Sequence, residues 1–389
     1  MNPVAQTVPN VAPMRLRTFA HLRELDGVRG VAALMVFFHH VCFTSIPAGA
    51  WSWPVRLLRT LSAQGSYGVD LFFVLSGFLI TSLLLEARPR PAYYRDFYWK
   101  RALRILPLYM LCLLGVLLFA PGSRDFVILS AIFLSNFAHV LHVQGTGPFW
   151  TLAIEEQFYL LWPTVVRRLK TGALQRWALA IGVGTILLRL IAALFGHRDY
   201  YFTFFHCDGL AWGAYLACWF SQRGAAKENA RREGYAIAIG LVTGMMLIAL
   251  SLGHAVSLRA LAFAACLRQT GVALLAAAVI AFLITHAGAR YLGALRSGPL
   301  PFFGLISYAM YMLHLYAMEL YDRLRGAPRV GDDLAYTLRF ACVLGGTIAL
   351  CLVSRYAIEL PAISLRRFVL ARPAVPQRED VAPIPLANM

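Results

Sequence analysis

Charged residues are scarce in this 389-residue chain, at 14%, whereas hydrophobic residues make up 59% and the mean hydropathy is +0.62. So apolar a composition does not describe a soluble core. Apolar runs long enough to cross a bilayer, roughly 17 to 25 residues, recur almost to the C-terminus. The sequence therefore predicts an all-α fold, a polytopic bundle of transmembrane helices.

Acidic residues are the scarcer charge, with 19 Asp and Glu against 36 Lys and Arg and a formal net charge of +17. In a soluble protein this excess would suggest nucleic acid as a partner. Here the basic residues form short clusters between apolar segments, as the positive-inside rule expects of cytoplasmic loops. We therefore expect the lipid bilayer, and no nucleic acid, as a partner.

Paired cysteines and a cleavable leader are also missing. The seven cysteines are scattered, almost all within apolar segments, and no CxxC pair occurs. This pattern indicates neither a disulfide framework nor a zinc site, so no metal is expected. No signal-peptide cleavage pattern follows the first apolar segment, which we interpret as a retained helix.

The number of membrane spans follows from the loop charges. Apolar segments lie at about 27–45, 67–86, 101–120, 125–141, 149–166, 177–196, 204–221, 235–252, 262–286, 301–320 and 336–356. Basic clusters lie in the N-terminal tail and at 88–104, 167–176, 223–232 and 366–367. If 125–141 is re-entrant or interfacial, every cluster faces the cytoplasm. The sequence thus predicts ten spans in the cytoplasmic (inner) membrane, with both termini in the cytoplasm.

This topology divides the chain into three parts. Residues 1–24 form a cytoplasmic tail, residues 25–366 one transmembrane domain, and residues 367–389 a second cytoplasmic tail. The Pro-rich ends, 1–13 and 373–386, have the composition of disordered tails. No internal repeat is evident.

The first candidate site lies in the segment LDGVRGVAALMVFFHHV, which contains Asp26, Arg29, His39 and His40. Arg29 and His40 are eleven residues apart, which brings them to within roughly 20° of one helix face and about 16 Å apart along the axis. An imidazole at membrane depth requires hydrogen-bond partners or a functional role, and histidine is suited to transferring a proton. The alternatives are that Arg29 only anchors the helix at the cytoplasmic surface and that His40 only forms a hydrogen bond with a neighbouring helix. His39 points about 100° away and is the weaker candidate.

Two further segments carry charge. Arg101 and Arg104, in RDFYWKRALRILPLY, are one turn apart, so their guanidinium groups can converge on an anion such as a phosphate; the alternative is a purely topological role. Glu155 and Glu156, in GPFWTLAIEEQFYLLWP, lie in a span, where carboxylates are costly. At least one of them needs a partner or is kept neutral by burial, and a structural ion pair is the alternative.

Other polar groups are expected to be buried in the bundle. They are Asp70, Arg189, Asp208, Tyr308, Tyr311, His314 and Glu359. The predicted topology places Asp70, Arg189, Asp208 and the two glutamates in the outer half of the membrane. It places Arg29, Arg101, Arg104 and Glu359 at the inner edge. His40 lies between the two sets, as a proton-transfer group should when donor and acceptor come from opposite sides.

Taken in order, these segments resemble the acyltransferase 3 family of integral membrane O-acyltransferases. The resemblance runs from about residue 25 to about residue 366 and includes GVDLFFVLSGFLI, WTLAIEEQFYLLWP, SYAMYMLHLY and SRYAIELP. It implies an enzyme that uses cytoplasmic acyl-CoA, commonly acetyl-CoA, as a co-substrate and holds no permanent cofactor. Some members carry an extra C-terminal hydrolase-like domain, and none is expected here.

The resemblance also implies roles for individual residues. It makes His40 the catalytic histidine, with Arg29 as its motif partner and Glu155 as the motif carboxylate. It makes Arg101 and Arg104 the donor-binding arginines. The acceptor is then a hydroxyl of a cell-surface or lipid-linked glycan, or of a macrolide-type sugar. No role carries over to His206.

Several alternatives stay open. A proton-coupled transporter also places His, Glu and Arg inside a helical bundle, although it often shows internal pseudo-symmetry. A scaffolding protein would not explain so many buried charges. The sequence leaves open the acceptor, the acyl chain length, a homo-oligomer, and the choice between direct transfer and an acyl-histidine intermediate.

Overall fold

The computed structural model describes residues 22–45, 49–145, 147–197, 201–222, 227–252 and 257–369. Within these residues, all the regular secondary structure is helical. The long helices are α2 (Arg23–Phe38), which continues as a π-helical turn (His39–Thr44), α4 (Gly68–Ala87), α5 (Tyr93–Phe119), α7 (Phe149–Arg168), α8 (Thr171–Leu194), α9 (Thr203–Ser221), α10 (Lys227–Leu250), α11 (Leu258–Thr285), α14 (Ser307–Arg325) and α15 (Asp333–Ser354). The shorter helices are α3 (Trp53–Ser62), α6 (Arg124–Ala131), α12 (Gly293–Arg296), α13 (Pro299–Leu305), α16 (Leu360–Ser364) and α17 (Arg366–Val369).

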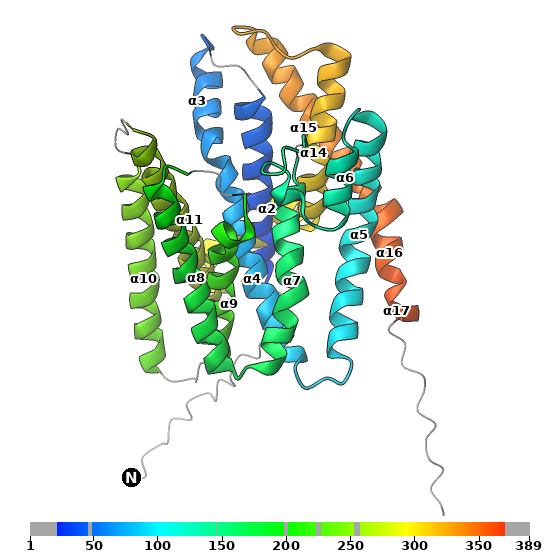
Figure 1. Ribbon diagram of the computed structural model, residues 1–389. Helices are drawn as coiled ribbons and strands as arrows, with labels where there is room; N and C mark the ends of the chain where they lie inside the picture. The colour runs from blue at the N-terminus through cyan, green and yellow to red at the C-terminus, as the bar shows by residue number, and fades with distance from the viewer. Residues whose placement is uncertain are drawn as a thin grey trace, which may run out of the picture.

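The helices form the membrane bundle that the composition predicts (Figure 1). Seven stretches of the described chain are long and apolar enough to cross a bilayer, or eight if α13 and α14, bent by 82°, count as one span. Helices α7 and α9 run alongside them in Figure 1. The all-α membrane fold is thus confirmed, and the total of ten spans stays a prediction.

The segment 125–141 forms only the eight-residue helix α6 and a 3₁₀ turn, Ser135–Phe137. A helix of eight residues is about 12 Å long, far shorter than the hydrocarbon core of a bilayer. The predicted tails lie mostly outside the described residues, as do Arg15 and Arg17 of the N-terminal basic cluster and Arg223 of the 223–232 cluster. The described chain starts one residue before α2.

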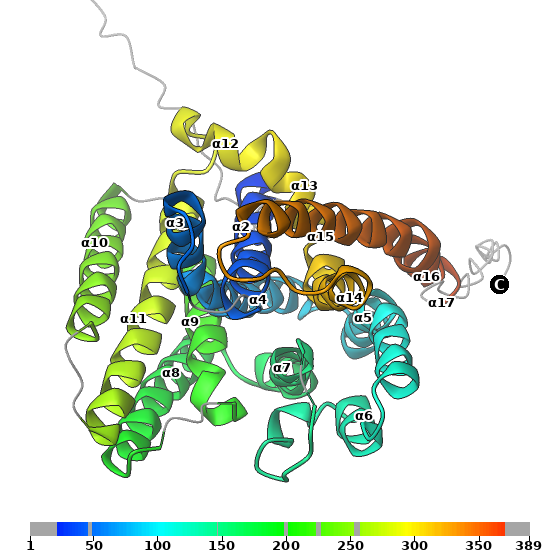
Figure 2. The ribbon, with the colours of Figure 1, turned by 90° about the horizontal axis from the view of Figure 1, so that it is seen from above.

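Seen from above, α2 and α4 lie near the middle of the bundle, with α8 to α11 on one side and α5, α14 and α15 on the other (Figure 2). Glycine allows the central helices to approach closely. A Cβ on Gly77 of α4 would meet the carbonyl of Leu210, and one on Gly213 of α9 would meet the carbonyl of Val74. Small residues let membrane helices pack backbone to backbone in this way. The contact fixes α4, which carries Asp70 and Ser76, against α9.

Candidate active site

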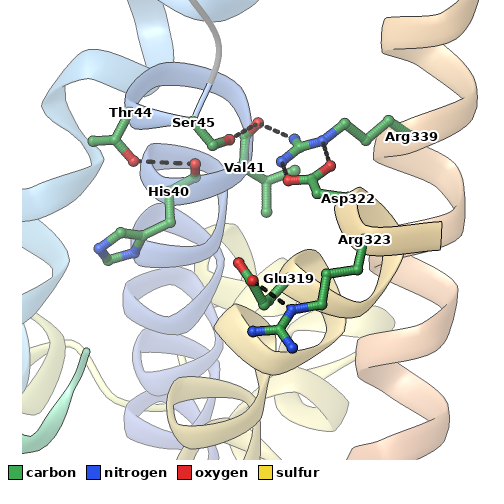
Figure 3. Close-up of polar contacts among 8 residues, drawn as sticks. All are labelled: His40, Val41, Thr44, Ser45, Glu319, Asp322, Arg323 and Arg339. Atoms are coloured by element: carbon green, nitrogen blue, oxygen red, sulfur yellow. Dashed lines mark hydrogen bonds and ion pairs between the residues drawn. The ribbon is translucent and has the colours of Figure 1, made fainter. Parts of the chain in front are cut away.

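His40 lies where helix α2 changes from α to π geometry, within the turn His39–Thr44. The amide of Ser45 bonds the carbonyl of His40, five residues back, at 3.2 Å, and the Thr44 hydroxyl donates to the same carbonyl at 3.1 Å (Figure 3). Single π turns of this kind are frequent at functional sites. The apolar periodicity that predicts the helix does not reveal this change.

The ring of His40 is held through one nitrogen only. Its Nδ1 lies 3.0 Å from the Val36 carbonyl and 3.1 Å from Nε2 of His314, whose own Nδ1 lies 2.9 Å from the Met310 carbonyl. Because carbonyls only accept, two neutral rings would each carry the proton on Nδ1. The single Nδ1–H of His40 is then shared between the Val36 carbonyl and Nε2 of His314. Nε2 of His40 keeps its lone pair and has no partner among the described residues.

A cavity of about 2130 Å³ opens beside His40. Its wall includes Asp70 of α4, Trp150 of α7, His206 of α9 and Gln269 of α11. The rings of Trp150 and His206 are 5.3 Å apart, and Nε2 of Gln269 lies 2.7 Å from Nδ1 of His206. Because helices from all parts of the bundle contribute, this aromatic and polar wall exists only in the folded chain.

A second cavity, of about 400 Å³, lies where α2 begins and α15 has ended. Five basic side chains line it against two carboxylates: Arg29, Lys100, Arg104, Arg355 and Arg366 against Asp26 and Glu359. Tyr308 also lines it, and its hydroxyl donates to the Ile105 carbonyl at 2.7 Å. Asp26 lies 3.4 Å from Arg29, and Ser354 donates to Glu359 at 3.0 Å. The excess of positive charge suits a polyanion.

The arginine pair of helix α5 is divided between two surroundings. Arg104 lines the basic cavity, whereas the guanidinium of Arg101 lies 4.3 Å from the ring centre of Tyr159. Lys100, one full turn from Arg104, is the second residue of α5 in the cavity. Residues four apart lie closer to one helix face than residues three apart do, which explains why Lys100, and not Arg101, lines the cavity together with Arg104. Sequence reasoning missed Lys100 and Arg366, which lie in basic clusters, and Arg355, which lies in the segment SRYAIELP.

Glu155 and Glu156 have different surroundings. The hydroxyl of Ser76 donates to Oε1 of Glu155 at 2.7 Å. One carboxylate oxygen of Glu156 is buried without a hydrogen-bond partner among the described residues. A hydrogen bond through Glu155 therefore joins α7 to α4.

The remaining predicted residues make contacts that join helices of the bundle. Arg189 of α8 and Asp208 of α9 form a buried ion pair that joins these two helices. The Tyr311 hydroxyl and the Thr151 hydroxyl lie 2.5 Å apart, which joins α14 to α7. The Arg189–Asp208 contact is of the kind expected of a structural ion pair, whereas Tyr311 also lines the larger cavity.

Comparison with known proteins identifies the family of this chain. Residues 22–356 match the family described as an acyltransferase domain, acyltransferase 3. The chain belongs to this family. The resemblance drawn from the motifs is thereby confirmed, and the matched region includes both cavities except for Glu359, Ile363 and Arg366.

Individual acyltransferase 3 relatives match over a shorter region. The chain is 30% identical over 164 residues, 37% of its length, to the peptidoglycan O-acetyltransferase OatA of Listeria monocytogenes. It is 33% identical over 175 residues, 38% of its length, to the O-acetyltransferase OatA of Staphylococcus aureus. The matches cover 24% and 25% of these relatives, so the chain spans about a quarter of their length. No solved structure matches the chain.

Proposed function

We propose that this protein is an O-acyltransferase that moves an acetyl group from cytoplasmic acetyl-CoA to a hydroxyl of a cell-surface glycan, with His40 as the general base. The observation that carries the proposal is the ring of His40. Its Nδ1 is occupied by the Val36 carbonyl and His314, whereas its Nε2 has no partner in the part of the chain that the structure describes, and the residue lines a large cavity. The names of the relatives, which are O-acetyltransferases, support the choice of acyl group and acceptor.

The chemistry requires two proton transfers and one displacement. A sugar hydroxyl is a weak nucleophile until a base takes its proton. Nε2 of His40 accepts that proton while the oxygen attacks the thioester carbonyl. The new C–O bond replaces the C–S bond, and the CoA thiolate leaves and takes the proton from the imidazolium. His314 and the Val36 carbonyl hold the other ring nitrogen throughout, so the ring keeps its orientation.

The basic cavity is the proposed site for the phosphates of the donor. Arginine binds phosphate with two parallel hydrogen bonds, and lysine adds a point charge. Arg29 and His40 are about 16 Å apart along α2. The thioester must therefore reach His40 on the long pantetheine arm. The positive-inside rule places this cavity on the cytoplasmic side.

The larger cavity is the proposed acceptor site. Trp150 and His206 offer ring faces to a sugar, and Gln269 and Asp70 offer hydrogen-bonding groups beside them. Such a mixture of aromatic and polar side chains is usual for a pocket that must both bind and orient a polar ligand. The acceptor that fits is a glycan, free or lipid-linked, presented from the outer side.

The test is a comparison of the two adjacent histidines. We expect His40→Ala to lower acetyl transfer by roughly 100-fold to 10,000-fold, the usual contribution of a general base. His39→Ala should have a much smaller effect, because Nδ1 of His39 bonds the carbonyl of Ser62, the last residue of α3, at 3.2 Å. Transfer of radiolabelled acetyl from acetyl-CoA into base-labile ester is measured in membranes of cells that make equal amounts of each variant. An active His40 variant beside an inactive His39 variant would refute the assignment.

A further inference from the structure

The π turn that carries His40 is bonded to a buried arginine on another helix (Figure 3). Nη1 of Arg339, on α15, donates to the carbonyl of Val41 at 3.0 Å. The Ser45 hydroxyl donates to the same carbonyl at 3.1 Å. The backbone carbonyl next to His40 is therefore held by side chains, one of which comes from 298 residues along the chain.

The other nitrogens of Arg339 bind one carboxylate. Nε and Nη2 donate to the two oxygens of Asp322, on α14, at 2.7 and 2.6 Å. The Arg339 side chain is 1% exposed and that of Asp322 is 23% exposed. Every nitrogen of the guanidinium group thus has an acceptor, two on α14 and one on α2. Lysine cannot reproduce this fork, because its single ammonium lacks the planar set of donors.

An ion pair whose arginine is fully buried is an inefficient way to hold two helices together. Desolvation of the two charges offsets much of their attraction, and well-packed apolar residues in their place are often as stable or more so. The surrounding contacts are already apolar, since Phe340 of α15 packs against Phe37 and Phe38 of α2. The feature that apolar residues would not supply is the bond to the Val41 carbonyl.

Helix α14 therefore reaches the π turn by two routes. His314 bonds the ring of His40 directly, at 3.1 Å. Asp322 acts on the backbone one residue further along, by orienting Arg339. The two contacts together determine both where the turn lies and which way the ring faces.

We propose that Arg339 and Asp322 are positioning residues that hold the π turn, through the Val41 carbonyl, in the register that directs Nε2 of His40 into the large cavity. The inference rests on the proposed role of His40 as the base. Neither side chain touches the reacting atoms, so both act on the rate of transfer and not on the binding of the donor.

The decisive variant replaces both charges at once, Arg339→Met with Asp322→Leu. We expect it to fold, since apolar residues replace a buried pair, but to lose on the order of 100-fold in kcat, the cost of a misplacement of about 1 Å. The KM for acetyl-CoA should not change. Arg339→Lys keeps the charge and should lose kcat in the same way. Rates are measured by acetyl transfer in membranes, donor affinity by titration of purified protein, and folding by the thermal midpoint.

Glu86 and Arg90 supply a control, because they form a local ion pair four residues apart, at 3.3 Å, that is partly exposed and lines neither cavity. Glu86→Leu with Arg90→Met should retain the wild-type kcat. The proposal is overturned if the Arg339 and Asp322 variants keep the wild-type kcat, or if their lost rate equals their loss of folded protein. His40→Ala is assayed in parallel. If it is active, the proposed function fails; if it is inactive while the Arg339 variants are active, only this inference fails.

Discussion

Two adjacent histidines begin the π turn that follows helix α2, and they differ in their hydrogen-bond partners. His39 contacts the Ser62 carbonyl, whereas His40 contacts His314, 274 residues away. Helical phase relative to Arg29 predicts which of the two is the better candidate for catalysis. It does not predict the partner, because no local pattern relates residues on helices so distant in sequence. The lone pair on Nε2 of His40 follows from the Val36 carbonyl, because that acceptor keeps the proton on Nδ1.

At the same scale, the surroundings of Arg101 and Arg104 predict unequal effects on the donor. Arg104→Ala should weaken acetyl-CoA binding by about tenfold or more, since a hydrogen bond to a charged group contributes about 1.5 to 3 kcal/mol. Arg101→Ala should weaken it less, because Arg101 lies over Tyr159 and outside the basic cavity. Isothermal titration of the purified variants measures both. Unchanged affinity in both variants would leave the pair a purely topological role.

At the scale of elements, the close approach of α4 and α9 holds the wall of the large cavity. A methyl group on Gly213 would meet the Val74 carbonyl, whereas one on Gly184, in α8, would meet nothing within 4 Å. Gly213→Ala should therefore lower the free energy of unfolding by roughly 1 to 3 kcal/mol. Gly184→Ala should be neutral or stabilise its helix. Thermal unfolding of the two purified variants gives the comparison, and equal midpoints would contradict the packing argument.

At the scale of the whole molecule, the two cavities lie at opposite ends of α2, so the orientation of the bundle decides which substrate comes from which side. The positive-inside rule places Arg167 and Arg168, at the end of α7, in the cytoplasm. Single cysteines at 168 and 144, in a chain whose seven native cysteines are replaced, should react with an impermeant thiol reagent from the inside and the outside respectively. Labelling of position 168 from the outside would refute the topology of ten spans.

The amino-acid sequence alone determined the class of fold, because the length and hydropathy of a segment decide whether it can cross a bilayer. It also determined the family, because the motif residues stand in a fixed order along the chain. Only the tertiary structure decided that His40 pairs with His314, that Arg104 lines the basic cavity while Arg101 does not, and that Arg339 holds the π turn. The physical reason is that periodicity records which face of a helix is apolar, whereas these contacts depend on which helices that face meets.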